Sequence, residues 1–285
     1  MPVVPDLGGT VVERVLRVGD KSLLALGHRD GRPVVVKALT TTDPFWRERF
    51  AHEIAVYRAL AETPSPAPTP ALIHTDGERL LVLDRLPGRP LDADRYPARH
   101  LIDVEVTAAI EVVRSFATWH PPPGVLAPVF GYRDRIERYR GGGRYLGDDA
   151  AVVLHRLLDQ LGNPSVPAHG DPLPANLLVT DTGSGDVRCG LVDFEFTGLF
   201  LPGLDLAMLH TLLTGTPGAQ DRIRAVVADE RIERAFLVNQ AMVLTRELRI
   251  HRELDDGPLR RNRLTLIEPQ IHDLIHELHG LTEVR

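Results

Sequence analysis

The sequence predicts an α+β protein with two lobes, a small antiparallel sheet at the N-terminal end and a larger, mainly helical part after it. Short apolar runs separated by turn residues fill the segment 11–39, as in an antiparallel sheet. The segment 85–90 holds two prolines and a glycine, which interrupt regular structure. Beyond it, apolar residues recur mainly at helical spacing. We therefore expect an N-terminal lobe over residues 1–85 and a C-terminal lobe over residues 86–285.

Five strands and one helix are expected in the N-terminal lobe. Apolar runs bounded by turn residues place the strands at residues 11–16, 22–26, 33–37, 71–74 and 80–83. The helix is expected to run from Asp43 to about residue 61, because Asp43 suits an N-cap and Pro44 suits the first helical position. Four prolines between residues 64 and 70 end this helix, since proline cannot continue it.

The C-terminal lobe is expected to contain helices and one β-hairpin. Helical spacing of apolar residues places the helices at about residues 100–119, 132–139, 149–161, 204–213, 221–227, 231–253 and 258–279. Two apolar runs, residues 177–179 and 190–192, form the hairpin, and the aspartates and glycines of residues 181–186 suit its turn.

Composition limits where the protein works and what it binds. No apolar stretch approaches the roughly 18 uncharged residues of a membrane span, and residues 1–6 lack the basic start and apolar block of a signal peptide. The one cysteine, Cys189, cannot form an internal disulfide, so we expect a reducing cytoplasm. A net charge of -6 argues against a nucleic-acid surface and permits cationic substrates. The sequence does not indicate an oligomeric state.

The pattern that carries chemistry is the run His169-Gly170-Asp171 with Asn176 five residues later, followed by Asp193-Phe194-Glu195. Phosphoryl transfer needs an acid near the accepting hydroxyl, an amide oxygen on a metal ion, and a second acid that bridges this metal to the nucleotide phosphates. Asp171, Asn176 and Asp193 supply these three groups. The sequence therefore predicts a phosphotransferase catalytic loop.

The expected hairpin brings Asn176 beside Asp193. Amide and carboxylate oxygens at one end of a paired ladder form a site that suits a hard cation such as Mg²⁺. Asp and Asn are also common turn residues, but a purely structural role does not explain the whole constellation.

A nucleotide site is expected in the N-terminal lobe. Lys37, one of only two lysines, ends an apolar strand and is a candidate phosphate ligand, with Glu53 as its partner inside the apolar stripe of the helix. The turn before Ser22 would either cover phosphates, using backbone amides and the Ser22 hydroxyl, or serve as an ordinary hairpin turn. The backbone carbonyl of Asp84 and the amide of Leu86 are candidates for the edge of an adenine.

Together these residues resemble the aminoglycoside phosphotransferase family, small-molecule kinases that share the protein-kinase-like fold. The resemblance covers about residues 11–210. It rests on residues 34–37, Glu53, residues 83–88, 169–176, 193–195 and 202–207.

The resemblance implies a role for each matching residue. Asp171 would orient and deprotonate the substrate hydroxyl, Asn176 and Asp193 would bind Mg²⁺, and Lys37 would hold the phosphates of ATP. Asp205 would brace the catalytic loop through its backbone, although it could instead cap a helix starting at the next residue.

Two further residues complete the implied site. His169 would be structural. Glu195 stands where protein kinases have glycine and would reach a metal-bound water or a cationic substrate. The segment 202–205 follows so closely that no protein-kinase activation segment fits, which argues against a protein substrate.

The leading hypothesis is an ATP- and Mg²⁺-dependent kinase that phosphorylates a hydroxyl of a small polar molecule. An aminoglycoside or other cationic antibiotic is the expected acceptor, giving resistance by modification; a sugar or amino-sugar metabolite is the alternative. Two other classes stay open: a nucleotide-binding regulator without transfer activity, and a metal-dependent hydrolase that uses His169, Asp171 and Asp193.

The acceptor is expected between the catalytic loop and the C-terminal helices. Acidic residues that would face a cation there are Glu230, Glu233, Glu247, Glu253, Asp255 and Asp256. Arginines in the same region weaken the case for an acidic patch.

Overall fold

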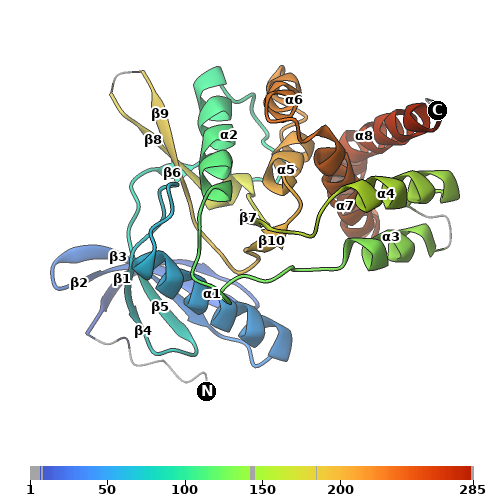
Figure 1. Ribbon diagram of the computed structural model, residues 1–285. Helices are drawn as coiled ribbons and strands as arrows, with labels where there is room; N and C mark the ends of the chain where they lie inside the picture. Colours follow the sequence, from blue (N-terminus) through green and yellow to red (C-terminus); the bar gives the residue numbers. More distant parts are fainter. Residues whose placement is uncertain (1–6, 8, 142–144, 184, 284–285) are drawn as a thin grey trace.

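The fold of the chain is seen in a computed structural model that describes residue 7 and residues 9–141, 145–183 and 185–283. An antiparallel sheet at the N-terminal end adjoins a mainly helical part, which confirms the predicted fold class (Figure 1). Residues 1–6 and Ser184 of the expected hairpin turn lie outside the described residues. Among the helices of the described ranges, none has the length and apolar character needed to cross a membrane.

The five expected strands form one sheet in the order β1-β2-β3-β5-β4. Their bounds are β1 Val11–Val18, β2 Ser22–Arg29, β3 Arg32–Leu39, β4 Leu72–Thr75 and β5 Leu80–Asp84. The β2–β3 turn consists of Asp30 and Gly31, both with positive φ, as two-residue hairpin turns require. Alternation along β3 buries Val34 and Val36 in a small cluster on one face and directs Lys37 toward the other face, where Leu39 joins the main core.

Helix α1 (Pro44–Glu62) begins where the sequence predicts. The Asp43 side chain accepts a hydrogen bond from the backbone N–H of Phe45 at 2.8 Å, and Pro44 occupies the first turn. The expected apolar stripe is buried, with Phe50 and Tyr57 inside it, and Glu53 shares this burial. Helix α1 thereby delivers one carboxylate into the interior beneath the sheet.

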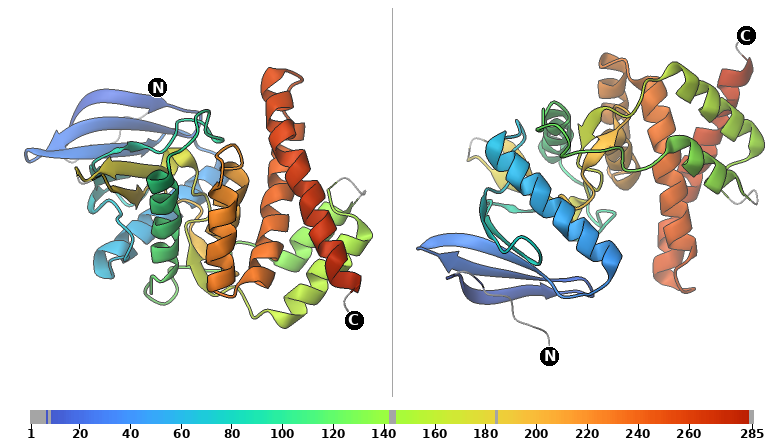
Figure 2. Two further views of the ribbon diagram at one scale, coloured as in Figure 1. Left: turned by 90° about the horizontal axis from the view of Figure 1, so that it is seen from above. Right: turned by 60° about the horizontal axis from the view of Figure 1, so that its bottom comes forward.

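Seven further helices match the expected ones to within a few residues. They are α2 (Asp103–Ala117), α3 (Tyr132–Arg140), α4 (Asp148–Gln160), α5 (Leu204–Leu212), α6 (Ala219–Asp229), α7 (Glu233–Arg252) and α8 (Pro258–Glu283). All nine residues of α5 are buried, and α7 packs against both α5 and α8. Figure 2 shows the sheet and α1 at one side of the molecule and the pair α7 and α8 at the other.

The predicted hairpin is present as β8 (Leu177–Asp181) and β9 (Val187–Leu191), and it corrects one expectation. The segment 85–90 was expected to interrupt regular structure, but its last two residues form the strand β6 (Arg89–Pro90), which pairs with β8. Gly88 before it, with a φ of 119°, lies so close to Val179 and Thr180 that a side chain would collide with them. The division into lobes 1–85 and 86–285 stays a prediction.

Three other short elements, besides β6, were not expected. The strands β7 (Val166–Ala168) and β10 (Gly198–Phe200) pair with each other, and the 3-10 turn η2 (Pro174–Asn176) precedes β8. Three residues are too few for an alternating pattern to be recognised in a sequence. These elements nevertheless frame the segments that carry the candidate catalytic residues.

The N-cap of α1 gives a direct test of this local structure. Replacing Asp43 with Ala removes the acceptor for the Phe45 amide and should lower the free energy of unfolding by about 1 kcal/mol, measured by urea denaturation. Asp43→Asn should leave stability nearly unchanged, because asparagine caps helices as well as aspartate does. Equal stability of the Ala variant and the natural protein would contradict the capping role.

Candidate active site

The loop between β7 and β8 carries Asp171 and is held in one conformation by its own backbone. The carbonyl of Asp171 accepts a hydrogen bond from the Leu173 amide at 2.7 Å, and the carbonyl of Leu173 accepts one from the Asn176 amide at 2.7 Å. Gly170 has a φ of 79°, and a Cβ there would overlap the carbonyl oxygen of Phe196. Only glycine allows this approach, which places the half-buried Asp171 at the turn.

Asp205 on α5 braces this loop. Its two carboxylate oxygens accept hydrogen bonds from the backbone amides of His169 at 2.7 Å and Gly170 at 2.9 Å. Burial raises the pKa of Asp205, although the two amide donors favour the ionised form. Helix α5 begins at Leu204 with Gly203 as its N-cap, so the alternative that Asp205 caps this helix is wrong.

The side chain of His169 is buried and ties the loop to the end of β9. Its Nε2 lies 2.9 Å from the carbonyl oxygen of Val192, and its ring contacts that of Phe194 with centroids 5.0 Å apart. Phe194 is fully buried and also packs edge-on against Tyr57 of α1. This aromatic packing fixes the position of the acids on either side of Phe194.

Asn176 and Asp193 lie at the same end of the hairpin. The amide of Val192 donates to the backbone carbonyl of Asn176 at 3.1 Å, which brings the residue after it, Asp193, alongside. The Asn176 side-chain nitrogen donates to the Asp171 carbonyl at 3.0 Å. This bond orients the amide, and no described residue donates to its oxygen Oδ1, so that oxygen is available to a cation. The donor pair of Oδ1 and the Asp193 carboxylate has the chemistry that Mg²⁺ prefers.

Both lysines of the chain meet one cluster of acids. Lys37 Nζ lies 2.6 Å from Glu53, contacts Asp193 more closely still, and lies 3.7 Å from Glu195. Lys21, from the β1–β2 turn, forms a short ion pair with Glu195, and its Nζ lies 4.3 Å from the centroid of the Trp46 ring. The expected Lys37–Glu53 pair is present. No role was predicted for Lys21, and the scarcity of lysine was the only sequence signal for it.

The acids and lysines of this cluster change one another's pKa values. Burial alone would lower the pKa of Lys37, but the carboxylates of Asp193, Glu53 and Glu195 raise it well above the usual range. Burial raises the pKa of Glu53 to about 7, against the opposing effect of Lys37. Burial opposes the ionisation of Asp193, but Lys37, together with Lys21 and His169, lowers the pKa of that carboxyl. Oxygen atoms of the three acids lie within 4.8 Å of one another. Only when Glu53 is also ionised do the three acids exceed the two ammonium groups by one charge.

The other residues predicted to contact the nucleotide lie in or beside the N-terminal sheet. The backbone carbonyl of Ser22 accepts a bond from the Gly19 amide at 2.9 Å, which closes an ordinary hairpin turn. The Asp84 amide donates to Ala71 at 2.8 Å within the sheet, and Leu86 follows it, half-buried. Contacts of Ser22, Asp84 and Leu86 with a nucleotide stay predictions.

Most acids expected to face a cationic acceptor already have arginine partners. Glu247 is fully buried and accepts two bonds from Arg95, at 2.6 and 2.8 Å. The hydrogen bonds from Arg95 lower the pKa of Glu247, although burial opposes this. Arginine partners also engage Glu230, Glu253 and Asp256.

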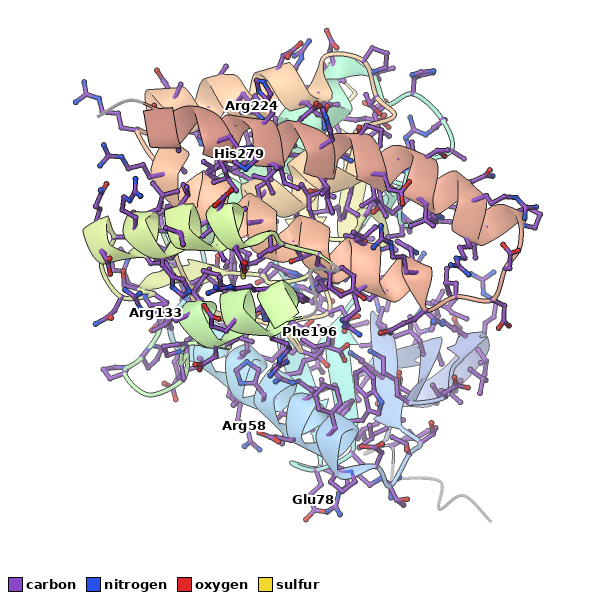
Figure 3. The ribbon with its side chains drawn as sticks, turned by 90° about the vertical axis from the view of Figure 1, so that its right-hand side faces the viewer. Arg58, Glu78, Arg133, Phe196, Arg224 and His279 are labelled. Carbon is purple, nitrogen blue, oxygen red and sulfur yellow. The ribbon has the colours of Figure 1, made fainter. Side chains whose placement is uncertain are left out.

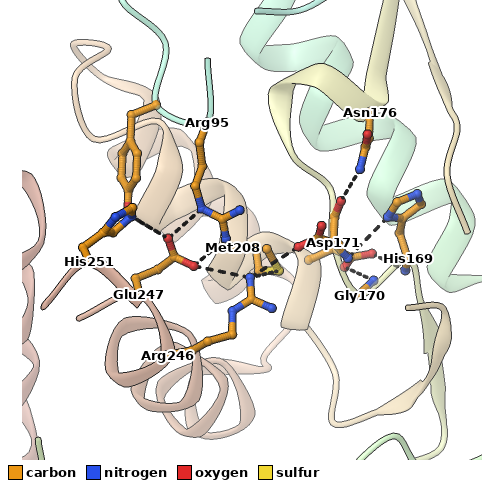
Figure 4. Close-up of polar contacts among 11 residues, drawn as sticks. Arg95, His169, Gly170, Asp171, Asn176, Met208, Arg246, Glu247 and His251 are labelled. Atoms are coloured by element: carbon orange, nitrogen blue, oxygen red, sulfur yellow. Dashed lines mark hydrogen bonds and ion pairs between the residues drawn. The ribbon is translucent and has the colours of Figure 1, made fainter. Parts of the chain in front are cut away.

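Arg246 on α7, which the sequence suggested only as one of the arginines opposing an acidic patch, links this network to the loop (Figure 4). One of its guanidinium nitrogens lies 3.4 Å from Asp171 Oδ1 and 3.3 Å from Glu247 Oε1. The candidate catalytic carboxylate therefore has a cationic neighbour from the C-terminal helices.

A loop that presents an acid and an amide, together with a buried lysine and a second acid, is typical of phosphoryl-transfer enzymes. The chain belongs to the phosphotransferase enzyme family, whose model matches residues 23–237. The expected resemblance is thereby confirmed.

Solved structures share the fold. Aminoglycoside phosphotransferase APH(4)-Ia is 14% identical, with a TM-score of 0.60, and the match covers 93% of this chain and 92% of that one. Macrolide 2'-phosphotransferase MphH from Brachybacterium faecium is 16% identical, with a TM-score of 0.59 and 93% of each chain covered. No curated protein sequence matches the chain.

The buried lysine can be tested by stability. Replacing Lys37 with Met leaves Glu53 and Asp193 without their closest cation and should lower the free energy of unfolding in urea by about 3 kcal/mol. Adding Glu53→Gln to that variant should recover part of the loss, because it removes a buried unpaired charge. Lys21→Met is the control: this lysine is more exposed and should cost at most about 1 kcal/mol. Strictly additive effects of the Lys37 and Glu53 replacements would show that the pair is not coupled.

Proposed function

We propose that the protein is an ATP- and Mg²⁺-dependent phosphotransferase that moves the terminal phosphoryl group of ATP to a hydroxyl of a small polar molecule. The observation that carries the proposal is the convergence of Asp171 and Asn176, from one loop, with Asp193 and Lys37, from two other segments. A nucleotide-binding regulator would not need this complete set. A metal-dependent hydrolase would use the acids but leave Lys37 and its pair with Glu53 unexplained.

Asp171 is proposed to act on the acceptor. Its carboxylate is half-buried at a turn whose backbone is fixed by Asp205 and by Gly170. It would accept a hydrogen bond from the acceptor hydroxyl, orient the oxygen toward the phosphorus, and take the proton as the new bond to phosphorus forms. Arg246, 3.4 Å from Asp171 Oδ1, would help to hold this carboxylate in position.

Asn176 Oδ1 and the Asp193 carboxylate are proposed to hold Mg²⁺. The ion, when bound, would neutralise charge on the terminal phosphates. Glu195 contacts both lysines and lies close enough to the metal ligands to accept a hydrogen bond from a metal-bound water. Lys37 would hold phosphate oxygens as a point charge, and Lys21 is available for the same purpose from the β1–β2 turn.

The acceptor is proposed to be a hydroxylated antibiotic or a sugar-like metabolite. Two of the similar structures carry the names of aminoglycoside and macrolide phosphotransferases, and one of them is a complex with ADP and hygromycin B. Modification of such a compound would give resistance. The buried thiol of Cys189 is compatible with the cytoplasm, where ATP is supplied.

The proposal is tested by ADP release with ATP and Mg²⁺ across a panel of hydroxylated antibiotics, sugars and amino sugars. Asp171→Asn should lower kcat on any acceptor that is turned over by about a thousandfold, while binding of a non-hydrolysable ATP analogue stays unchanged. The control is Asp149→Asn, an exposed aspartate on α4. Full activity of the Asp171 variant would remove this residue from the mechanism, and acceptor-independent release of phosphate would favour a hydrolase.

The metal ligands make a separate prediction. Asp193→Asn should raise the Mg²⁺ concentration needed for analogue binding by at least about tenfold, because a neutral amide binds a hard cation less well than a carboxylate. Calorimetry at a series of Mg²⁺ concentrations measures the change, with Asp149→Asn again as control. An unaltered Mg²⁺ dependence would exclude Asp193 as a ligand.

A further inference from the structure

A cavity of about 310 Å³ lies beside the catalytic loop. Gly170, the residue before Asp171, forms part of its wall, and the remaining wall comes from the start of α1, α3 and the segment before it, the chain after Asp193, and helices α5 and α7. Phe196, which lines it, lies between α1 and α3 (Figure 3). Its volume is near the lower end of small-ligand pockets, and its position suits the acceptor of the proposed reaction.

The charge of this cavity is strongly one-sided. Four arginines line it, Arg49, Arg135, Arg246 and Arg249, and none of the described lining residues is acidic. Arg246 has carboxylate partners in Asp171 and Glu247, and Arg249 has one in Glu253. These two arginines are therefore partly neutralised.

Arg49 and Arg135 have no such compensation. No carboxylate of the described residues lies within ion-pair distance of either, and both guanidinium groups lie against aromatic rings instead. Arg49 is 5.4 Å from the centroid of Phe45 and 5.5 Å from that of Phe196, and Arg135 is 3.5 Å from that of Phe130. A ring covers the flat face of a guanidinium and leaves the N–H groups at its edge available to an acceptor.

Two further observations indicate that an anion completes the cavity. The Nε atoms of Arg49 and Arg246 are buried without a hydrogen-bond partner among the described residues, and buried donors of this kind are rarely left unsatisfied. Burial, together with the positive charges of Arg246 and Arg138, lowers the pKa of Arg135. Mutual repulsion of the arginines would fall when a negative group binds between them.

We propose that the acceptor is an anion: a hydroxylated small molecule that bears a carboxylate or phosphate group, bound at the guanidinium edges of Arg49 and Arg135. This inference rests on the proposed phosphotransferase function and narrows its substrate class. A planar carboxylate or a phosphate accepts paired hydrogen bonds from a guanidinium edge, and the phenylalanines contact the apolar part of the molecule. A polycation would meet four guanidinium groups in the same space, so cationic aminoglycosides are poor acceptors.

The test compares three probes that share a benzene ring with a hydroxymethyl group and differ in the para substituent, which is anionic, neutral or cationic. They are para-(hydroxymethyl)benzoate, the neutral para-benzenedimethanol, and the cationic para-(aminomethyl)benzyl alcohol. Each is titrated calorimetrically into the full chain with Mg²⁺ and a non-hydrolysable ATP analogue. We expect the benzoate to bind at least about tenfold more tightly than the neutral probe, and the cation to bind most weakly. Equal affinities, a preference for the cation, or no binding of the benzoate would overturn the proposal.

Matched variants locate the preference. Arg49→Gln combined with Arg135→Gln should reduce the benzoate preference to within about twofold, and each single variant should reduce it partly. The control is Arg133→Gln, because Arg133 lies on α3 two residues from Arg135 but pairs with Asp159 at 2.6 Å on the exposed side (Figure 3). A preference that persists in the double variant would overturn the assignment to these arginines.

The same titrations test the nucleotide site and the cavity separately. Binding of the ATP analogue tests the nucleotide site of the proposed function, whereas the order of the three probes tests the cavity. If the analogue binds but the affinities of the three probes do not depend on their charge, only the proposal of an anionic acceptor is overturned. The probes are also titrated without the analogue. If the analogue does not bind but the probes still bind in the expected order of charge, the ATP-dependent function is overturned and the anion site stands.

Discussion

The ion cluster around Lys37 is the interaction on which the arrangement of the site depends. Lys37 comes from β3, Glu53 from α1, and Asp193 from the chain after β9, so one buried ammonium group joins the sheet, its helix and the hairpin end. Such charges are stable in the interior only when each has a partner. The sheet can therefore dock on the helical part in few ways, and the docking that pairs these charges also places Asp193 beside Asn176.

Local patterns accounted for most of the fold. Asp43 and Pro44 mark the start of α1 because capping is decided by adjacent residues, and the five strands of the sheet are long enough for their alternation to be recognised. The short strands β6, β7 and β10 owe their existence to pairing with distant segments. β6 even contains Pro90, so no local rule favours it.

The candidate site also contains some residues that the sequence predicts and others that only the fold brings together. The residues from His169 to Asn176 form one continuous loop, so the spacing of its catalytic groups is visible in the sequence. Glu53 was predicted because a carboxylate in an apolar stripe needs a partner. The arginines of the cavity come from α1, α3 and α7, and in a chain where 31 of 33 basic residues are arginine they carry no local signal. Acids counted along the C-terminal helices suggested a cationic ligand, but pairing with arginines had already neutralised several of them.

The position of the two lysines also determines how the protein reacts with amine reagents. Apart from the α-amino group of the chain, the primary amines of the protein are those of Lys21 and Lys37, which both pair with acids of one ion cluster. Acylating labels, amine crosslinkers and amine-reactive surfaces therefore have no other lysine to react with. Lys21, whose side chain is 30% exposed, is the more accessible of the two. Bioconjugation through lysine is consequently site-directed by composition, and immobilisation through a lysine would anchor the protein at this ion cluster.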